Sequence, residues 1–403
     1  AKALKYGLNG LLKMAKDNYD NVDDEGREFY DAFEVCVKAC ERLVVKYREK
    51  AKEMGIETYC IAWAQGAYCK DYADHFYDIS IVDKEAIVNL CMDEAIDGII
   101  SNAIEAAVPT MAYVSEKCGF NGNSFEAACK AINKKEMRLA VEKHKACEQP
   151  QFRILTDMDF IPDAFPIIVK PTDSSCSNGV TKVNCLEEYY RAIERATLAS
   201  DSGELLVEEF VHGREVSVES ISYHGNHYVL TITDKETTGE PYFVETAHHQ
   251  PSDLPEEIQE QLKMSVPRIL DALGITNGAS HAEFKIDDRG NIKFIEIGAR
   301  GGGDHISYQL VKLSTGYDYV KGMIEVALNQ FSEPKINNKA YSGVYFLSKN
   351  TAYIKNFIIN NCMKSWVVDF EIQETPLKEL TKSQDRTGFI IYKSSEKILV
   401  NNE

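Results

Sequence analysis

Residues 281–297 read HAEFKIDDRGNIKFIEI and carry the strongest structural signal in the chain. In its first half Ala, Phe and Ile alternate with His, Glu and Lys, which predicts a β-hairpin whose polar side chains share one face. The turn is expected at residues 289–290, or over the longer loop 288–291. Either turn pairs position 287 with position 292 and fixes the register of the hairpin.

This register places Glu283 directly opposite Glu296. Directly opposed residues have Cβ atoms about 4.5–5.5 Å apart, so two carboxylates there repel each other unless a proton or cation lies between them. A shared Mg²⁺ would remove the repulsion, because hard divalent cations bind carboxylate oxygens together with substrate phosphates. The alternatives are an exposed hairpin whose carboxylates turn into water, and a three-residue loop that shifts the register.

The hairpin continues directly into the glycine-rich loop Gly298-Ala-Arg-Gly-Gly-Gly-Asp304. Successive glycines let the backbone approach a ligand closely and point N–H groups at it. The guanidinium of Arg300 could hold a transferring phosphoryl group or a tetrahedral oxyanion. The alternative is a flexible loop with a solvated arginine, and the adjacent carboxylate pair favours the functional interpretation.

Two segments upstream have the composition of a nucleotide site. In residues 165–180 an apolar strand ends at Lys170, and a loop of Ser, Asn and Gly follows that could cover phosphates while the lysine neutralises them. In residues 205–219 an apolar strand runs into Glu208, which could bind the adenine amino group, and Glu215 could accept both ribose hydroxyls. A plain surface loop and a half-exposed hairpin are the respective alternatives.

Helix and strand patterns alternate in the first third of the chain, which predicts a small parallel α/β domain. The expected elements there are helix 1–54, strands 57–63, 77–82 and 98–100, and helices from 84 and over 108–118. The remainder is expected to be β-rich, with helix 134–145, strands 165–170, 205–211, 215–223 and 227–233, helices 255–273 and 306–330, and a tail of short strands with helix 351–360.

Length and composition exclude several classes of protein. The chain has 403 residues, enough for two or three domains, and a net charge of −18, which argues against a nucleic-acid binder. It has no apolar run long enough to span a membrane and no signal peptide pattern. Its 11 cysteines are scattered without a CxxC pair, and we interpret them as free thiols in a reducing cytoplasm.

Together these segments resemble the ATP-grasp superfamily, specifically its carboxylate–amine ligases, with the L-amino acid ligase or biotin carboxylase-like fold. Residues 133–138, NKKEMR, resemble the family's K-x-x-M-R helix, which implies that Lys134 is the first nucleotide lysine. Residues 165–170 resemble the strand of the second, phosphate-binding lysine. The next loop resembles the flexible lid, with nucleotide contacts implied for Ser174, Ser175, Ser177 and Gly179.

The resemblance extends over residues 55–403 and implies roles for further side chains. Glu208, Glu209 and Val211 match the adenine hinge, and Glu215 matches the ribose acid. Residues 233–235 resemble the segment that supplies a third cation, and residues 245–251, ETAHHQP, resemble the E-x-G-H-x-x-P stretch on the acceptor side. The implied catalytic residues are Arg300, Lys235 and His248, and the implied Mg²⁺ ligands are Glu283 and Glu296.

The chain departs from the family pattern in two places. Where many members read Glu-x-Asn-x-Arg, this chain has Gly298 in place of the asparagine, so water or Asp304 would have to complete the metal coordination. Residues 1–50 lack the usual opening strand and Gly-rich turn, and instead weakly resemble a helical segment of glycyl-radical enzymes such as pyruvate formate-lyase. A natural variant, a fusion or an artificial join would each explain this start.

The resemblance implies an ATP-grasp fold with four regions: a helical segment 1–50, a pre-ATP-grasp α/β domain 51–133, the ATP-grasp domain 134–330 and a small α+β subdomain 331–403. It implies ATP and Mg²⁺, which Mn²⁺ could replace, as cofactors of an ADP-forming ligase. The expected partners are a small carboxylate and an amine. The oligomeric state is not readable from the sequence, although dimers are the commonest soluble assembly and a homodimer is one candidate. The alternatives are a thiol or bicarbonate substrate, and a catalytically degenerate ATP-binding module.

Overall fold

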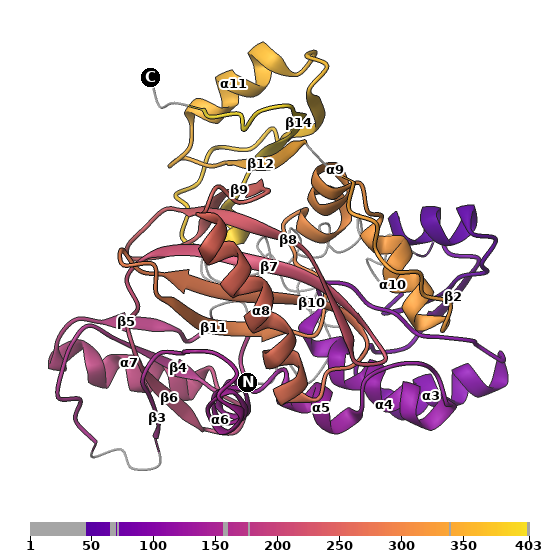
Figure 1. Cartoon of the computed structure of the whole chain (residues 1–403), viewed down its shortest axis with the longest axis horizontal. Helices are drawn as coiled ribbons and strands as arrows, with labels where there is room; N and C mark the ends of the chain where they lie inside the picture. The colour runs from indigo at the N-terminus through magenta and orange to yellow at the C-terminus, as the bar shows by residue number, and fades with distance from the viewer. Residues whose placement is uncertain are drawn as a thin grey trace, which may run out of the picture.

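The computed structural model describes residues 46–64, 70, 72–155, 160–175, 178–337 and 340–400 (Figure 1). Within these residues the strands form a two-stranded, a four-stranded and an eight-stranded sheet. Parallel and antiparallel sheets with covering helices confirm the predicted mixture of α/β and α+β structure. The predictions for residues 1–45 lie outside the described part of the chain. Residues 46–53, which are described, form a helix.

The N-terminal region contains the predicted small parallel sheet, formed by β1 (Tyr59–Ala62) and β2 (His75–Asp78). Its helices are α3 (Lys84–Asp93), α4 (Val108–Cys118) and α5 (Phe125–Lys130), with a 3₁₀ turn η4 (Glu105–Ala107) before α4. The prediction of a third strand over residues 98–100 is wrong, because this segment is irregular. Gly98 packs closely against the end of a helix, where an added Cβ would lie 2.8 Å from the Ala327 carbonyl oxygen.

The four-stranded sheet is antiparallel in the order β3-β6-β4-β5. Its strands are β3 (Phe152–Leu155), β4 (Ile167–Pro171), β5 (Thr181–Val183) and β6 (Leu205–Glu209). The amphipathic helix α7 (Leu186–Leu198) packs on one face through Tyr189, Ala192 and Ala196, which are fully or almost fully buried. This lobe lies beside the larger sheet in Figure 1.

The eight-stranded sheet is antiparallel in the order β11-β10-β7-β8-β9-β12-β14-β13. Its strands are β7 (Arg214–Tyr223), β8 (Asn226–Thr237), β9 (Glu245–Gln250), β10 (Gly278–Ile286), β11 (Ile292–Gly298), β12 (Tyr341–Leu347), β13 (Val367–Ile372) and β14 (Gly388–Ser394). Helices α6 (Lys134–His144) and α8 (Glu256–Leu273) bury their apolar residues against one face, and α8 crosses the sheet in Figure 1. The last three strands and α11 (Tyr353–Asn361), with a short η6 (Ser383–Asp385), confirm the predicted C-terminal mixture of strands and one helix.

The predicted hairpin is present, but the register near its turn was wrong by one residue. Ile286 pairs with Ile292, because the turn spans residues 287–291 and is closed by the Asp287 side chain, which accepts from the Arg289 and Asn291 N–H groups. A β-bulge then shifts the register between Phe284 and Glu283. The shift restores the predicted pairing of Glu283 with Glu296 and leaves Ile295 without an opposite residue.

The helix expected over residues 306–330 is interrupted. The structure has a π-helical turn η5 (Ile306–Leu310), then α9 (Val311–Thr315), and then α10 (Tyr319–Ala327). The break occurs because Gly316 adopts a left-handed φ of 76° and the Asp318 side chain caps the new helix by accepting from the Lys321 N–H. None of the helices in the described residues is long and apolar enough to cross a membrane.

Candidate active site

The carboxylates of Glu283 and Glu296 lie on adjacent strands at one edge of the eight-stranded sheet. Glu283 is held through Oε1, which lies 2.8 Å from Lys235 Nζ and 3.2 Å from His281 Nε2. Burial would raise the pKa of Glu283, but Lys235 and His281 outweigh it and hold that pKa well below its ordinary value. Lys134, whose Nζ is 3.4 Å from Glu296 Oε2, likewise lowers the pKa of Glu296. Both groups are therefore anionic near neutral pH.

The donor set of this pair fits a magnesium ion that arrives with a nucleotide. No group of three or more His, Cys, Asp or Glu side chains suited to a metal ion is found among the described residues. Mg²⁺ is commonly bound through one or two carboxylates, with phosphates and water completing the shell. Glu283 and Glu296 supply those two carboxylates.

Gly298 leaves room for the Arg300 side chain at the position where the resemblance led us to expect an asparagine. A Cβ added at Gly298 would lie 3.2 Å from Arg300 Cζ and 3.3 Å from its Nε, so the arginine folds back over the space of that side chain. Arg300 donates from Nη2 to Glu105 Oε2 at 3.1 Å and from Nη1 to the Gly301 carbonyl. Burial would lower the pKa of Arg300, but Glu105 outweighs it and raises that pKa.

The four-stranded sheet and α6 contribute a second group of cations. Asn133 caps α6 by accepting from the Glu136 N–H, and the helix then presents Lys134 toward both Glu296 and the predicted lid. Lys134 Nζ donates to the Ser174 carbonyl oxygen at 2.9 Å. Burial would lower the pKa of Lys134, but Glu296 outweighs it and raises that pKa.

Glu208 is buried between two cations. Its Oε1 accepts from Arg138 Nε at 2.8 Å, and its Oε2 lies 2.6 Å from Lys170 Nζ. Burial would raise the pKa of Glu208, but Arg138 and Lys170 outweigh it and lower that pKa to about 2. Arg138 also donates to the carbonyl oxygen of Ile295, the extra residue of the β-bulge, at 2.7 Å. The bulge therefore links the hairpin to the four-stranded sheet.

All but one of the remaining predicted nucleotide residues lie in the described part of the chain, on β6 or in the segments that follow β4 and β6. Ser174 and Ser175 follow β4, Gly179 has a φ of 75° beside Pro171 and Ala199, and Ser177 lies outside the described residues. Glu209 is exposed at the end of β6 and accepts from the Gln151 N–H at 3.1 Å, whereas Val211 is buried. Their contacts with a nucleotide stay predictions.

Lys235 is surrounded by carboxylates. Its Nζ lies 2.6 Å from Glu215 Oε1, 2.8 Å from Glu283 Oε1 and 3.4 Å from Glu245 Oε1. Burial would lower the pKa of Lys235, but these carboxylates outweigh it and raise that pKa well above its ordinary value. Lys235 thus joins the predicted ribose acid Glu215 to the carboxylate pair and to the acceptor-side strand β9.

His248 belongs to a second set of charges on the predicted acceptor side. Its Nε2 lies 3.3 Å from Asp304 Oδ2, and Asp304 Oδ1 accepts from Arg386 Nη1 at 2.8 Å. Arg386 Nη2 also donates to Glu245 Oε2 at 3.2 Å, and its guanidinium lies 3.8 Å from the centre of the Phe346 ring. Asp304 is therefore directed to Arg386 and His248. His249, the next residue of β9, instead contacts Tyr392 and Glu236.

Three residues of the site were missed in the sequence. Arg138 is the last residue of the K-x-x-M-R match, so its position carried a signal. Glu105 and Arg386 carried none, because they come from elements 195 and 86 residues from Arg300 in sequence, on opposite sides of it. Only folding brings them to the site.

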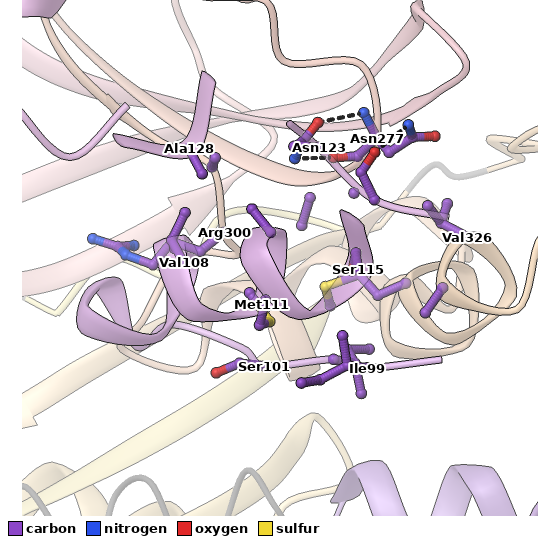
Figure 2. Close-up of a pocket in the computed structure, with 18 of the residues that line it drawn as sticks. Ile99, Ser101, Val108, Met111, Ser115, Asn123, Ala128, Asn277, Arg300 and Val326 are labelled. Atoms are coloured by element: carbon purple, nitrogen blue, oxygen red, sulfur yellow. Dashed lines mark hydrogen bonds between the residues drawn. The ribbon is translucent and has the colours of Figure 1, made fainter. Parts of the chain in front are cut away.

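A small cavity lies next to Arg300 (Figure 2). Its volume is about 80 Å³, and its walls come from α4, α10 and the loops around Asn123 and Asn277. Figure 2 shows the Arg300 guanidinium turned away from Asn123 and Asn277, whose amides are hydrogen-bonded to backbone groups of each other's segments. Arg300 is the one charged residue among those that line the cavity, and none of the carboxylates or lysines described above lines it.

Comparison with known proteins identifies a central domain. Residues 163–308 match the family model described as an ATP-grasp domain. The chain is 27% identical over 310 residues to the alanine–anticapsin ligase of Bacillus subtilis, and this match spans 67% of the chain and 65% of that protein. The chain therefore spans slightly less than two thirds of the length of this relative.

Solved structures share the arrangement of the elements. The L-amino acid ligase from Bacillus licheniformis superposes with a TM-score of 0.71 at 22% identity, over 87% of this chain and 90% of that one. The biotin carboxylase domain of the Hydrogenobacter thermophilus 2-oxoglutarate carboxylase, solved with Mg·ADP and bicarbonate, superposes with a TM-score of 0.67 at 18% identity, over 88% of this chain and 84% of that one. At these identities the superpositions show a common fold.

Proposed function

Because residues 163–308 match an ATP-grasp domain, we propose that the chain is an ADP-forming ligase of the ATP-grasp superfamily that activates a small carboxylate as an acyl phosphate and joins it to an amine. The observation that carries the proposal is the Glu283–Glu296 pair, which contacts Lys134 of α6 and Lys235 of β8, with Arg300 a few residues after Glu296. Anionic ligands and cations in this arrangement suit a transferring phosphoryl group.

ATP is proposed to bind between the two larger sheets. Lys134 and Lys170 would neutralise its phosphates, with Glu208 and Arg138 holding Lys170 in place. The lid at Ser174, Ser175, Ser177 and Gly179 would cover the phosphates, Glu209 and Val211 would line the adenine, and Glu215 would bind the ribose. A bound Mg²⁺ on Glu283 and Glu296 would stabilise the charge that develops on the transferring phosphoryl group.

The proposed reaction has two steps. A carboxylate oxygen of the first substrate attacks the γ-phosphorus, the bond to the ADP oxygen breaks, and ADP leaves. The amine then attacks the acyl carbon, the bond to the phosphate oxygen breaks, and the nitrogen loses a proton as phosphate leaves and the amide forms. Arg300 would hold the phosphoryl oxygens in the first step and the tetrahedral oxyanion in the second.

The acceptor side is proposed to lie at β9 and the glycine loop. Asp304 and Glu245 contact Arg386 there, and His248 contacts Asp304, so this side would present both carboxylates and a guanidinium to an incoming amine. The name of the Bacillus subtilis relative describes a ligase of alanine and anticapsin, and this supports amino acids as the first substrates to test.

The proposal is tested by ADP release from Mg·ATP against single amino acids and all their pairs. Release that needs two amino acids together, with formation of a dipeptide, is expected. Release with one carboxylate alone would point instead to a thiol or bicarbonate as the second substrate. ATP binding without any ADP release across the panel would refute ligation and favour a degenerate nucleotide-binding module.

A further inference from the structure

Two buried residues behind Glu283 have no role in the reaction described above. His281 is two residues before Glu283 on β10, and Glu219 lies opposite His281 on β7. Glu219 is fully buried, and His281 is 7% exposed. A carboxylate removed from water is costly unless donors surround it, so its retention under the site needs a reason.

The contacts of His281 connect the two carboxylates. Its Nδ1 lies 2.5 Å from Glu219 Oε1, and its Nε2 lies 3.2 Å from Glu283 Oε1. The imidazole therefore bridges Glu219 to the carboxylate that faces Glu296. Every hydrogen bond to Glu283 among the described residues ends on Oε1, from His281 or from Lys235. The second oxygen, Oε2, is left for a ligand.

The glycine loop packs directly on this pair. A Cβ added at Gly302 would lie 2.7 Å from His281 Nδ1 and 3.1 Å from Glu219 Oε2, which is itself buried without a hydrogen-bond partner among the described residues. A Cβ added at Gly303 would meet nothing within 4 Å. Gly302 is thus needed for the loop to close over the pair, and Gly303 is not.

We propose that Glu219 and His281 are positioning residues that hold the Glu283 carboxylate in one orientation and thereby set the affinity for the nucleotide-bound divalent cation. The inference rests on the proposed function, because it takes Glu283 as a ligand of that cation. Groups that orient a metal ligand without touching the metal commonly change metal affinity by about 10- to 100-fold when removed.

Two substitutions of His281 separate its two contacts. The amide nitrogen of Asn lies near the position of His Nδ1, and that of Gln lies near the position of Nε2. His281→Asn therefore keeps a donor toward Glu219 and loses the donor to Glu283, whereas His281→Gln does the reverse. We expect His281→Asn to weaken Mn²⁺ binding about 10- to 100-fold and His281→Gln to retain most of the affinity.

The measurement is the dissociation constant of Mn²⁺ from the full chain with saturating ADP, read from the electron paramagnetic resonance signal of free Mn²⁺. ADP affinity without divalent cation and the melting temperature are measured in parallel. His227→Asn is the matched control, because the side chain of His227 is also nearly buried and bridges two groups, Ser222 and Asp271, at the far end of the same sheet. It should leave Mn²⁺ affinity unchanged.

Gly302→Ala and Gly303→Ala in the glycine loop provide a second test. This test can still be carried out if His281→Asn fails to fold. Gly302→Ala is expected to weaken Mn²⁺ binding and Gly303→Ala to preserve it. Wild-type Mn²⁺ affinity in His281→Asn or in Gly302→Ala would overturn the inference. Absence of ADP-dependent Mn²⁺ binding in the unmodified chain would instead refute the metal site of the proposed function.

Discussion

Arg300 is held on one side of its guanidinium by Glu105 and the Gly301 carbonyl, while its Nε is buried without a hydrogen-bond partner among the described residues. Such a donor is available to a ligand oxygen. We predict that Arg300→Ala lowers the rate of ADP release at least 10²-fold, because a positioned charge at the reacting group is lost. Nucleotide affinity should change little.

The rate is compared with that of Arg289→Ala, which removes an exposed arginine from the hairpin turn. Calorimetry with ADP checks that both variants still bind nucleotide. Wild-type turnover in Arg300→Ala would remove this residue from the proposed mechanism.

Glu208 connects the site to pH-dependent stability. Its pKa falls from the ordinary 4.5 to about 2 on folding, so its stabilising effect is complete above pH 4.5 and is lost as pH falls toward 2. A shift of this size corresponds to about 3 kcal/mol. Glu208→Gln is predicted to destabilise the protein by about 3–5 kcal/mol at pH 7, because Arg138 and Lys170 are left buried without a counter-charge.

Denaturant unfolding at several pH values tests this prediction. The stability difference between Glu208→Gln and the unmodified chain should shrink as pH is lowered below 4.5. Glu204→Gln is the control, since its ion pair with Lys135 is partly exposed. A difference that stays constant with pH would contradict the role of the Glu208 charge.

At the scale of elements, the turn between β6 and β7 packs closely against the end of β10. Gly213 has a φ of 138°, and an added Cβ would lie 2.1 Å from the Ile286 carbonyl oxygen at the end of β10. Gly213→Ala is predicted to destabilise the protein by more than about 3 kcal/mol, because backbone would have to move. Gly225→Ala, at a φ of 79° with open space around it, should cost about 1–2 kcal/mol. Equal losses in chemical denaturation would contradict the role of the contact.

The small parallel sheet is predicted to be the least stable of the three sheets. Its two strands have four residues each, and every residue of both is at least partly exposed. Sheets this small depend on neighbouring packing. Hydrogen exchange should be faster for backbone amides of residues 59–62 and 75–78 than for β7, β8 and β10. Uniform protection across these strands would refute the prediction.

At the scale of the whole molecule, Arg386 connects the C-terminal region to the site. It donates to Asp304, which lies 82 residues earlier in the sequence. Arg386→Met is predicted to raise the KM of the amine substrate at least tenfold, because Asp304 and Glu245 lose their shared cation. The KM of ATP should stay the same. Initial-rate kinetics with both substrates varied would show this, with Lys349→Met, from an exposed ion pair, as the control. Equal changes in both KM values would place Arg386 outside the acceptor side.

Side-chain alternation and turn residues are local properties, and from them the sequence predicted the hairpin, its polar face and the presence of Glu283 and Glu296 on adjacent strands. The sequence also predicted where several strands and most helices begin. A capping residue such as Asn133 lies next to the helix it caps, so a helix start is a local property. It could not determine that a five-residue turn and a bulge would offset each other, because the register depends on the partner strand.

The meeting of charges in the site depends on the tertiary structure. Lys235 lies among three carboxylates from β7, β9 and β10, and Arg386 reaches the glycine loop from the C-terminal region. Residues 98–100 are irregular for a similar reason. Gly98 packs closely on the end of α10, and this contact takes the place of strand pairing. These outcomes depend on contacts between residues far apart in sequence, and local preferences carry no information about which distant side chains will share a buried space.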